Sequence, residues 1–349
     1  MTEKMKKEML PIFNYLYKME ARDLCTFDVR DYEFSRVVND ARRPESKLRE
    51  TVRESLDTDW RTYEETANIV VKTVIGKKWA NPFNYDYDAS LFANLLYQKT
   101  MLPSGSIEPL NFGEYEYMIF SGGIYYRGDT MNSWQTTLNK FIREHGEPYF
   151  KSPIPRGSRK LMEFLSNPEN YTEPLPSYIT EFMKVVYTIG NFIPVPLVPS
   201  FNIRRNSLVS DYWDLALLAI YRHYMDGAKS CGEKWQELFQ YGGTMCWLDW
   251  HGTGQTGWDD FVERNFLQDF VKEREGGGYG EPKPLWEKHF LGEVRPQEEG
   301  QFKQFFTNAS SWILARGNRI AISIKKKLEG KSDPEALESL ARQMIGEPV

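Results

Sequence analysis

The segment FNIRRNSLVSDYWDLALLAIYRHY, residues 201–224, places two arginines and two aspartates at the entrance to an almost continuously apolar run. From about Asp211 onward, apolar side chains recur at the spacing of an α-helix. The intervening positions are apolar as well, which is typical of a helix packed on all sides at the centre of a protein. We therefore predict a central apolar helix around residues 211–224. Its best-defined face comprises Trp213, Leu217, Ile220, Tyr221 and Tyr224.

The remaining periodic segments predict an α+β fold, predominantly helical with a small sheet. EYEYMIF at 114–120 and IYYR at 124–127 are alternating stretches joined by Ser-Gly-Gly, a pattern that predicts a β-hairpin. TIGNFIPVP at 188–196 indicates a short strand broken by its prolines, and TMCWLDW at 244–250 is a further candidate strand. The Gly- and Pro-rich stretch at 275–284 predicts a mobile loop. Helical patterns cover residues 3–22, 45–76, 89–100, a segment from about 133, 157–166, 177–187, 258–266 and 302–328.

Three parts of the chain differ in their pattern. We expect a helical N-terminal extension over residues 1–79, which is strongly charged between 42 and 64. The main α+β domain is expected over 80–330, and a helical C-terminal tail over 331–349. A chain of 349 residues is long enough to bury a substantial core in the main domain.

Composition indicates a cytoplasmic protein. The formal net charge of −5 gives no overall attraction to nucleic acid or to an anionic membrane. The apolar runs are much shorter than the roughly 18 residues of a membrane span, and the charged start MTEKMKKEML lacks the apolar core of a signal peptide. The three cysteines form no CxxC pair, which fits free thiols in a reducing compartment.

Several familiar chemical motifs are excluded or weak. GTGQTG at 252–257 matches G-x-G-x-x-G, but no second apolar strand follows within a βαβ unit, so a flexible turn is the favoured interpretation. The four histidines and three cysteines have no metal-binding spacing, and the sequence identifies no cofactor. His251 lies in a polar loop and is a candidate general base, while His223 is expected to be structural.

The candidate site is a polar cluster formed by two loops that each enter a predicted helix. YYRGDTMNSW and FNIRRNSLVSDYWD both carry arginine close to a helix start, where free N–H groups and guanidinium suit an anion. The same residues would also satisfy one another as a structural ion-pair network, with Arg204 or Arg205 as the partner of Asp214 and Asp211 at the helix cap. Both interpretations stay open. The candidate residues are Arg127, Asp129, Asn202, Arg204, Arg205, Asp211 and Asp214.

Three blocks of the chain resemble a family of uncharacterised bacterial proteins, common in Firmicutes and known only as a domain of unknown function. The first block is LFANLLYQKTMLPSG with the following GGIYYRGDTMNSW. The second is YTIGNFIPVP with FNIRRNSLVSDYWDLALLAIYRHY, and the third is GWDDFVERNFLQDFV. The resemblance covers roughly residues 88–273 and implies a shared fold and polar cluster, but no reaction.

Three functional classes stay open on these residues. The first is an enzyme acting on an anionic small molecule or nucleotide. One form of this class, only weakly supported, is an ADP-ribosyltransferase-like enzyme with Arg127 near a strand end. The second is a ligand-binding module with the same pocket. The third is a helical interaction module, with a protein partner or a homo-oligomer. A pocket lined by Arg127, Asn202 and Asp214 would favour the first two, and an exposed apolar stripe on 302–324 the third.

Overall fold

The protein has the predicted α+β fold, predominantly helical with a small antiparallel sheet. The computed structural model describes residues 12, 15–29, 89–102, 105–110, 117–132, 134–155, 164, 168–197, 201, 208–209, 212–292 and 295–329. The α-helices are α2 (Ala21–Thr26), α7 (Leu91–Thr100), α8 (Trp134–His145), α10 (Ser177–Val185), α12 (Trp213–Asp226), α13 (Glu233–Gln240), α14 (Gly242–Asp249), α15 (Gly254–Arg264) and α16 (Glu299–Leu328). The strands are β1 (Ser106–Pro109), β2 (Tyr117–Ser121), β3 (Ile124–Thr130), β4 (Phe192–Pro196), β5 (Val271–Glu273) and β6 (Tyr279–Pro282). Short 3₁₀ helices are η4 (Glu147–Tyr149), η5 (Pro168–Asn170), η6 (Ile189–Asn191), η7 (Ala228–Ser230), η8 (Gln268–Phe270) and η9 (His289–Leu291).

The main sheet is a four-stranded antiparallel meander in the order β1-β2-β3-β4. The predicted hairpin is confirmed as β2 and β3, and Gly122 and Gly123 supply the positive φ angles, 58° and 83°, that a tight two-residue turn requires. β4 contains Pro194 and Pro196 and is not broken by them, because it is an edge strand in which proline is tolerated.

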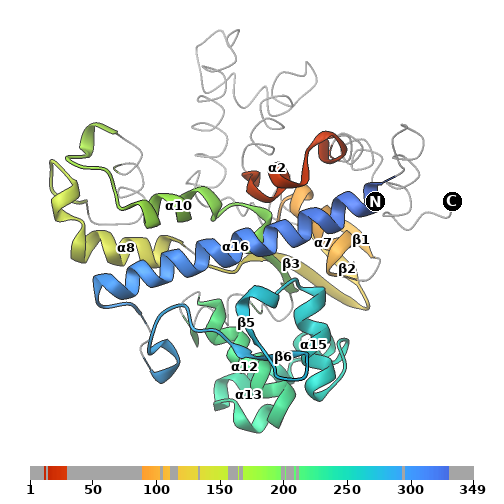
Figure 1. Cartoon of the computed structure of the whole chain (residues 1–349). Coiled ribbons are helices and arrows are strands. Elements are labelled where there is room, and N and C mark those ends of the chain that lie inside the picture. The colour runs from red at the N-terminus through yellow and green to blue at the C-terminus, as the bar shows by residue number, and fades with distance from the viewer. Residues whose placement is uncertain are drawn as a thin grey trace.

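Helix α16 is the longest of the described elements and runs across the described part of the protein (Figure 1). Its apolar stripe is buried, and α10 and α2 pack along it. Gly190 of η6 approaches it so closely that an added Cβ would lie 2.0 Å from the Ile313 carbonyl oxygen. Close packing against α16 therefore explains why the third residue of the TIG segment, Gly190, is a glycine. The buried apolar side chains of the stripe include Phe302, Phe305, Phe306, Ala309, Ile313, Ile320, Ala321, Ile324 and Leu328.

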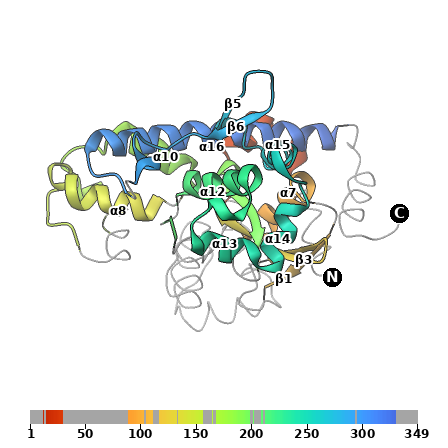
Figure 2. The same ribbon diagram turned by 90° about the horizontal axis from the view of Figure 1, so that it is seen from below.

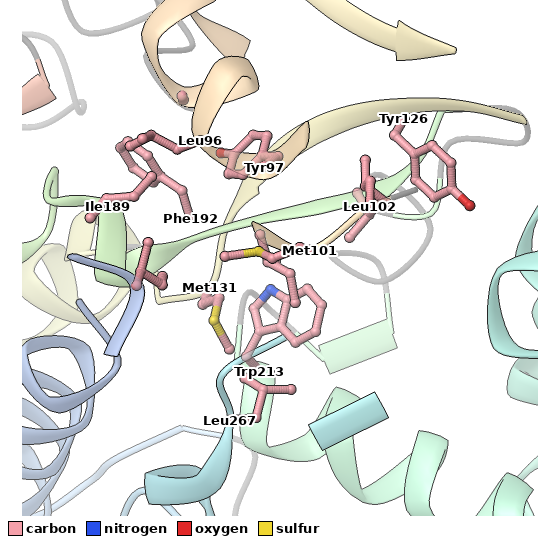
Figure 3. Packing of buried hydrophobic residues seen from close by; sticks show 14 of the residues in the cluster. Leu96, Tyr97, Met101, Leu102, Tyr126, Met131, Ile189, Phe192, Trp213 and Leu267 are labelled. Atoms are coloured by element: carbon pink, nitrogen blue, oxygen red, sulfur yellow. The ribbon is translucent and has the colours of Figure 1, made fainter. Parts of the chain in front are cut away.

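The predicted central helix is α12, which begins at Trp213 and ends at Asp226. Trp213, Leu217 and Ile220 are fully buried and Tyr224 is buried, whereas Tyr221 is only half-buried, so the predicted face is correct except at Tyr221. Figure 3 shows Trp213 beside Met101 and Met131, beneath the sheet and α7. Helices α12 to α15 form one group on one side of α16 (Figures 1 and 2).

Truncating Leu217 tests the central position of α12. We expect Leu217→Ala to lower the free energy of unfolding by about 2–5 kcal/mol, because a fully buried leucine loses its burial and leaves a cavity. Leu291→Ala is the matched control, since Leu291 is 83% exposed and its truncation should change stability by less than about 0.5 kcal/mol. Urea denaturation measures the free energy of unfolding of both variants. Equally small decreases for Leu217→Ala and Leu291→Ala would contradict the central position of α12.

Two predictions on short segments are wrong. TMCWLDW is not a strand but part of helix α14, which buries Thr244, Trp247 and Leu248 at helical spacing. The stretch at 275–284 is not simply a loop, because residues 279–282 form β6, paired with β5. The hairpin is tied to α15 by Trp258, whose indole N–H donates to the Gly280 carbonyl at 3.0 Å. A short apolar run fits either helix or strand, and only the tertiary partners decide.

The N-terminal segment packs into the same core as the main domain. Ile12, Leu16 and Leu24 are buried against residues of α7 and α16. The Lys325 ammonium of α16 also donates to the Tyr17 carbonyl at 2.6 Å. The predicted helices over 45–76 and 331–349 lie outside the described residues.

Candidate functional site

The two polar segments predicted to approach each other meet at Tyr212. Two residues after the end of β3, the backbone of Asn132 forms an isolated antiparallel bridge with Tyr212 just before α12. The Tyr212 hydroxyl and the Thr137 hydroxyl of α8 are 3.1 Å apart, and Tyr212 is 1% exposed. We call this place the Tyr212 junction, and it comprises Asn132, Thr137, Tyr212, Asp214, Trp286 and His289.

Asp214 is the acidic group of the junction. It lies in the first turn of α12, where the helix dipole favours a negative charge, and it is 2% exposed. Its Oδ2 accepts hydrogen bonds from His289 Nδ1 at 2.7 Å and from the Leu285 N–H at 2.8 Å. Its Oδ1 accepts from the Leu215 N–H at 2.9 Å. Among the described residues the partner side chain of Asp214 is therefore His289, whereas Arg204 and Arg205 lie outside the described residues and their pairing with Asp214 stays a prediction.

Aromatic rings enclose the His289 imidazole. The Trp286 ring stacks on it with centroids 3.5 Å apart and an interplanar angle of 18°. Tyr212 meets the imidazole edge-on at 5.1 Å and meets the Trp286 ring edge-on at 5.0 Å. His289 and Trp286 are each 1% exposed, so the carboxylate–imidazole pair lies inside the protein.

The junction contains buried polar atoms that have no hydrogen-bond partner in the part of the chain that the structure describes. These are His289 Nε2, Trp286 Nε1, and both the oxygen and the nitrogen of the Asn132 amide. Buried polar groups in native proteins are nearly always paired, and exceptions mark places where a water, an ion or a ligand binds. All three side chains belong to residues that contact Tyr212. The junction is therefore a candidate binding site.

The other predicted site residues are distributed differently. Arg127 and Asp129 lie two residues apart on β3, so they share one face of the sheet. Burial lowers the pKa of Arg127, and the nearby Asp129 carboxylate partly opposes that shift. Arg127 lies about 16 Å along the extended chain from Asn132, so it is not part of the junction. Asn202, Arg204, Arg205 and Asp211 lie outside the described residues.

Arg127 is also not at a strand end. It lies inside β3, opposite Val195 of β4, with three more residues of the strand after it. Within the described residues, no hydrogen bond joins Asp214 to Arg127 or Asp129. Of the described members of the predicted cluster, Arg127 and Asp129 lie on β3, and Asp214 lies at the junction with His289.

The G-x-G-x-x-G segment connects two helices, α14 and α15, and has no preceding strand. Gly252 and Gly254 have φ angles of 97° and 58°, which glycine adopts without strain. Gly257 packs against Gly252, since an added Cβ would lie 2.6 Å from the Gly252 carbonyl carbon. These glycines serve a tight helix–helix turn and not a nucleotide fingerprint.

A second histidine–carboxylate pair lies at the start of α15. His251 Nδ1 is 2.8 Å from Asp260 Oδ2, and Arg264 Nε donates to the same carboxylate at 2.8 Å. The Arg264 guanidinium also lies 4.9 Å above the Trp250 ring. Asp260, Arg264 and Trp250 are partly exposed, in contrast to the fully enclosed Asp214–His289 pair.

Acid should destabilise the fold through the buried His251 and the partly buried His223. Burial lowers the pKa of His251 below its ordinary 6.5, with Asp260 opposing, and burial likewise lowers the pKa of His223, with Asp249 opposing. Below pH 6.5 the unfolded chain therefore takes up protons that the folded chain resists, and stability falls as the pH drops toward the folded-state values.

The change in melting temperature between pH 7 and pH 5 measures this loss. We expect the drop to be smaller in His251→Gln and in His223→Gln, and smallest in the double variant. An unchanged drop in the double variant would contradict the assignment.

Sequence reasoning missed His289, Trp286 and Asn132. His289 lies 75 residues beyond its partner Asp214, so no local spacing connects the two. A usable signal is the segment PLWEKHF at 284–290, where leucine and tryptophan stand between polar residues in an otherwise loop-like stretch. Buried apolar residues in such a stretch indicate a segment anchored in the core, and Leu285 and Trp286 are indeed buried.

Comparisons with protein-family models, with curated proteins and with solved structures find no match for the chain. Within the described part of the chain, no group of three or more His, Cys, Asp or Glu side chains is arranged to hold a metal ion. None of the described helices combines the length and the apolar character needed to cross a membrane. The function is therefore argued from the chemistry of the junction.

Proposed function

We propose that this protein binds a small polar molecule at the Tyr212 junction. The sequence predicted an anionic small molecule or a nucleotide, and the proposal keeps the small ligand without its charge. One observation carries the proposal: four buried polar atoms, on the side chains of Asn132, Trp286 and His289, have no hydrogen-bond partner among the described residues. Each such atom costs roughly 1–3 kcal/mol of folding free energy when it stays unpaired. A bound molecule that pairs with several of them recovers that free energy and gains affinity from it.

The arrangement of the junction supports recognition by both rings and hydrogen bonds. The stacked Trp286 and His289 rings provide an apolar surface, and their nitrogens and the Asn132 amide provide donors and acceptors. Small-molecule sites in proteins combine mostly apolar walls with a few fixed polar groups in this way. Asp214 fixes the imidazole, as carboxylates do for histidines that bind ligands.

The apolar stripe of α16 does not favour an interaction module. Its side chains pack against α10, α8 and the N-terminal segment. Ile322 is the large apolar residue of α16 that is more than half exposed, at 53%. The surface that would have favoured protein binding is thus used for the protein's own core.

A cytoplasmic location and membership of the bacterial family also belong to this proposal. The three sequence blocks over residues 88–273 support the family. All three cysteines are free thiols, two of them buried, which supports a reducing compartment.

A thermal-shift screen of small polar metabolites and nucleotides tests the proposed function. A ligand present at a hundred times its Kd should add about 2.7 kcal/mol of stability. Trp286→Phe keeps the ring but removes the indole N–H, and should weaken or abolish the shift. Trp250→Phe makes the same change at the partly exposed Trp250 and should leave the shift intact. If no compound stabilises the wild type at millimolar concentration, the proposed function is wrong.

A further inference from the structure

We infer that the molecule bound at the Tyr212 junction is a neutral, hydroxyl-bearing compound whose hydroxyl group donates a hydrogen bond to His289 Nε2. This inference rests on the proposed function and narrows its ligand class. It follows from the hydrogen bonding of the imidazole and from the charge of its surroundings.

The partners of Asp214 determine which imidazole nitrogen carries the proton. A carboxylate oxygen accepts, so His289 Nδ1, at 2.7 Å from Asp214 Oδ2, is the donor in that hydrogen bond. In a neutral imidazole with a proton on Nδ1, Nε2 carries a lone pair and acts as an acceptor. With the ring in the neutral form that this inference assigns to it, His289 Nε2, which is buried and has no partner among the described residues, needs a donor from a bound molecule.

The Trp286 indole N–H, which belongs to the ring stacked on His289, needs a hydrogen-bond acceptor. Trp286 Nε1 can only donate, and it is also buried and unpartnered. The two rings are stacked, so both nitrogens lie at the rims of one ring stack. A hydroxyl group is both donor and acceptor, and a compound with one or more hydroxyl groups can serve His289 and Trp286 together. The Asn132 amide, which offers one donor and one acceptor group, has the same requirement.

The local charge disfavours an anion. The Asp214 carboxylate is buried at hydrogen-bond distance from the imidazole. An anion at Nε2 would have to be held in a low-dielectric interior beside a carboxylate, where repulsion between like charges is strong. A neutral molecule avoids this repulsion.

Asp214 acts through His289 and is a positioning residue. Its Oδ2 accepts hydrogen bonds from both the His289 imidazole and the Leu285 N–H. Asp214 therefore fixes the orientation of the imidazole relative to the segment that carries His289. The imidazole is 1% exposed, so the bound compound is enclosed and small.

Two matched sets of probes test the ligand class. The neutral set is glycerol, myo-inositol, ribose and uridine, and the anionic set is inorganic phosphate, malonate and uridine 5′-monophosphate. We expect a neutral probe to raise the melting temperature of the wild type, and its O-methyl ether to bind at least about 10-fold more weakly, because a site built around a hydroxyl rejects an analogue without it. His289→Phe keeps a flat ring without the acceptor and should lose the response, while His251→Phe should keep it.

Each result separates the inference from the proposed function. Stabilisation by the anionic set alone would overturn the inference and leave the proposed function standing. If no compound of the two sets and none of the wider screen stabilises the protein, the inference and the proposed function are both wrong, and the junction binds only water. If His289→Phe does not fold, the ¹⁵N shift of His289 Nε2 in the wild type replaces it. That shift should move when the neutral probe binds, and an unmoved shift would overturn the inference.

Discussion

Replacing Arg316 with methionine is expected to lower the free energy of unfolding by about 3–5 kcal/mol. Arg316 is fully buried in the middle of α16. Its Nε donates to the Asn265 carbonyl at 2.8 Å, and its Nη1 donates to the Gly190 and Phe192 carbonyls, each at 2.7 Å. The guanidinium thus joins α16 to η6, to the start of β4 and to the end of α15. Methionine fills much of the volume but leaves these three carbonyls without a donor.

The charge of Arg316 is retained in the folded protein. Burial lowers the pKa of Arg316 to about 9, which still leaves the guanidinium protonated at pH 7. Arg316→Lys should also destabilise the protein, because an ammonium cannot reproduce the planar geometry with which the guanidinium reaches three carbonyls.

Arg319 is the matched control for this experiment. It lies one turn further along α16 and pairs with Asp269 at 2.8 Å, but its side chain is 45% exposed. Arg319→Met should therefore cost no more than about 1 kcal/mol. Urea denaturation at pH 7 gives both values, and equal losses for the two variants would contradict the assignment of Arg316 as the buried link.

The second large effect is expected for Asp214→Asn. The amide keeps the size of the side chain but loses the charge that three donors share, and charge-assisted hydrogen bonds contribute about 1.5–3 kcal/mol to stability. We therefore expect Asp214→Asn to lower the free energy of unfolding by about 2–3 kcal/mol. We also expect the segment that carries Leu285 and His289 to open more often. Hydrogen exchange of the Leu285 amide should accelerate along with the fall in stability.

Asp260→Asn provides the comparison, since Asp260 holds His251 at 2.8 Å in the same way but is partly exposed. Asp260→Asn should lower the free energy of unfolding by no more than about 1 kcal/mol. A melting temperature of Asp214→Asn at or above that of the wild type would show instead that the carboxylate is held at a cost to stability, as functional groups often are.

The parts of the fold that could be predicted from sequence are those with a local cause. α12 is apolar on all sides, so its central position follows from its own residues. The β2–β3 turn follows from Gly122 and Gly123, which adopt the required φ angles. α16 follows from a long apolar stripe at helical spacing, and its three last-turn lysines complement the helix dipole.

The parts that could not be predicted depend on partners distant in the sequence. His289 and Asp214 are joined only by the fold, so no local spacing in the sequence indicated this pair. Arg316 did carry a signal, since it occupies the apolar stripe three residues after Ile313 and four before Ile320. A charged residue at such a position requires buried acceptors, but sequence alone does not say which carbonyls supply them.

The protonation of the His289 imidazole tests the central claim most directly, namely that Asp214 holds a buried imidazole with an accepting Nε2. Long-range ¹⁵N–¹H correlation spectra of histidine-labelled protein at pH 7 distinguish the two ring nitrogens, and the His289→Phe spectrum identifies the His289 signals. We predict a protonated Nδ1 and an unprotonated Nε2 without added ligand. A proton on Nε2, with Nδ1 either bare or also protonated, would contradict the claim.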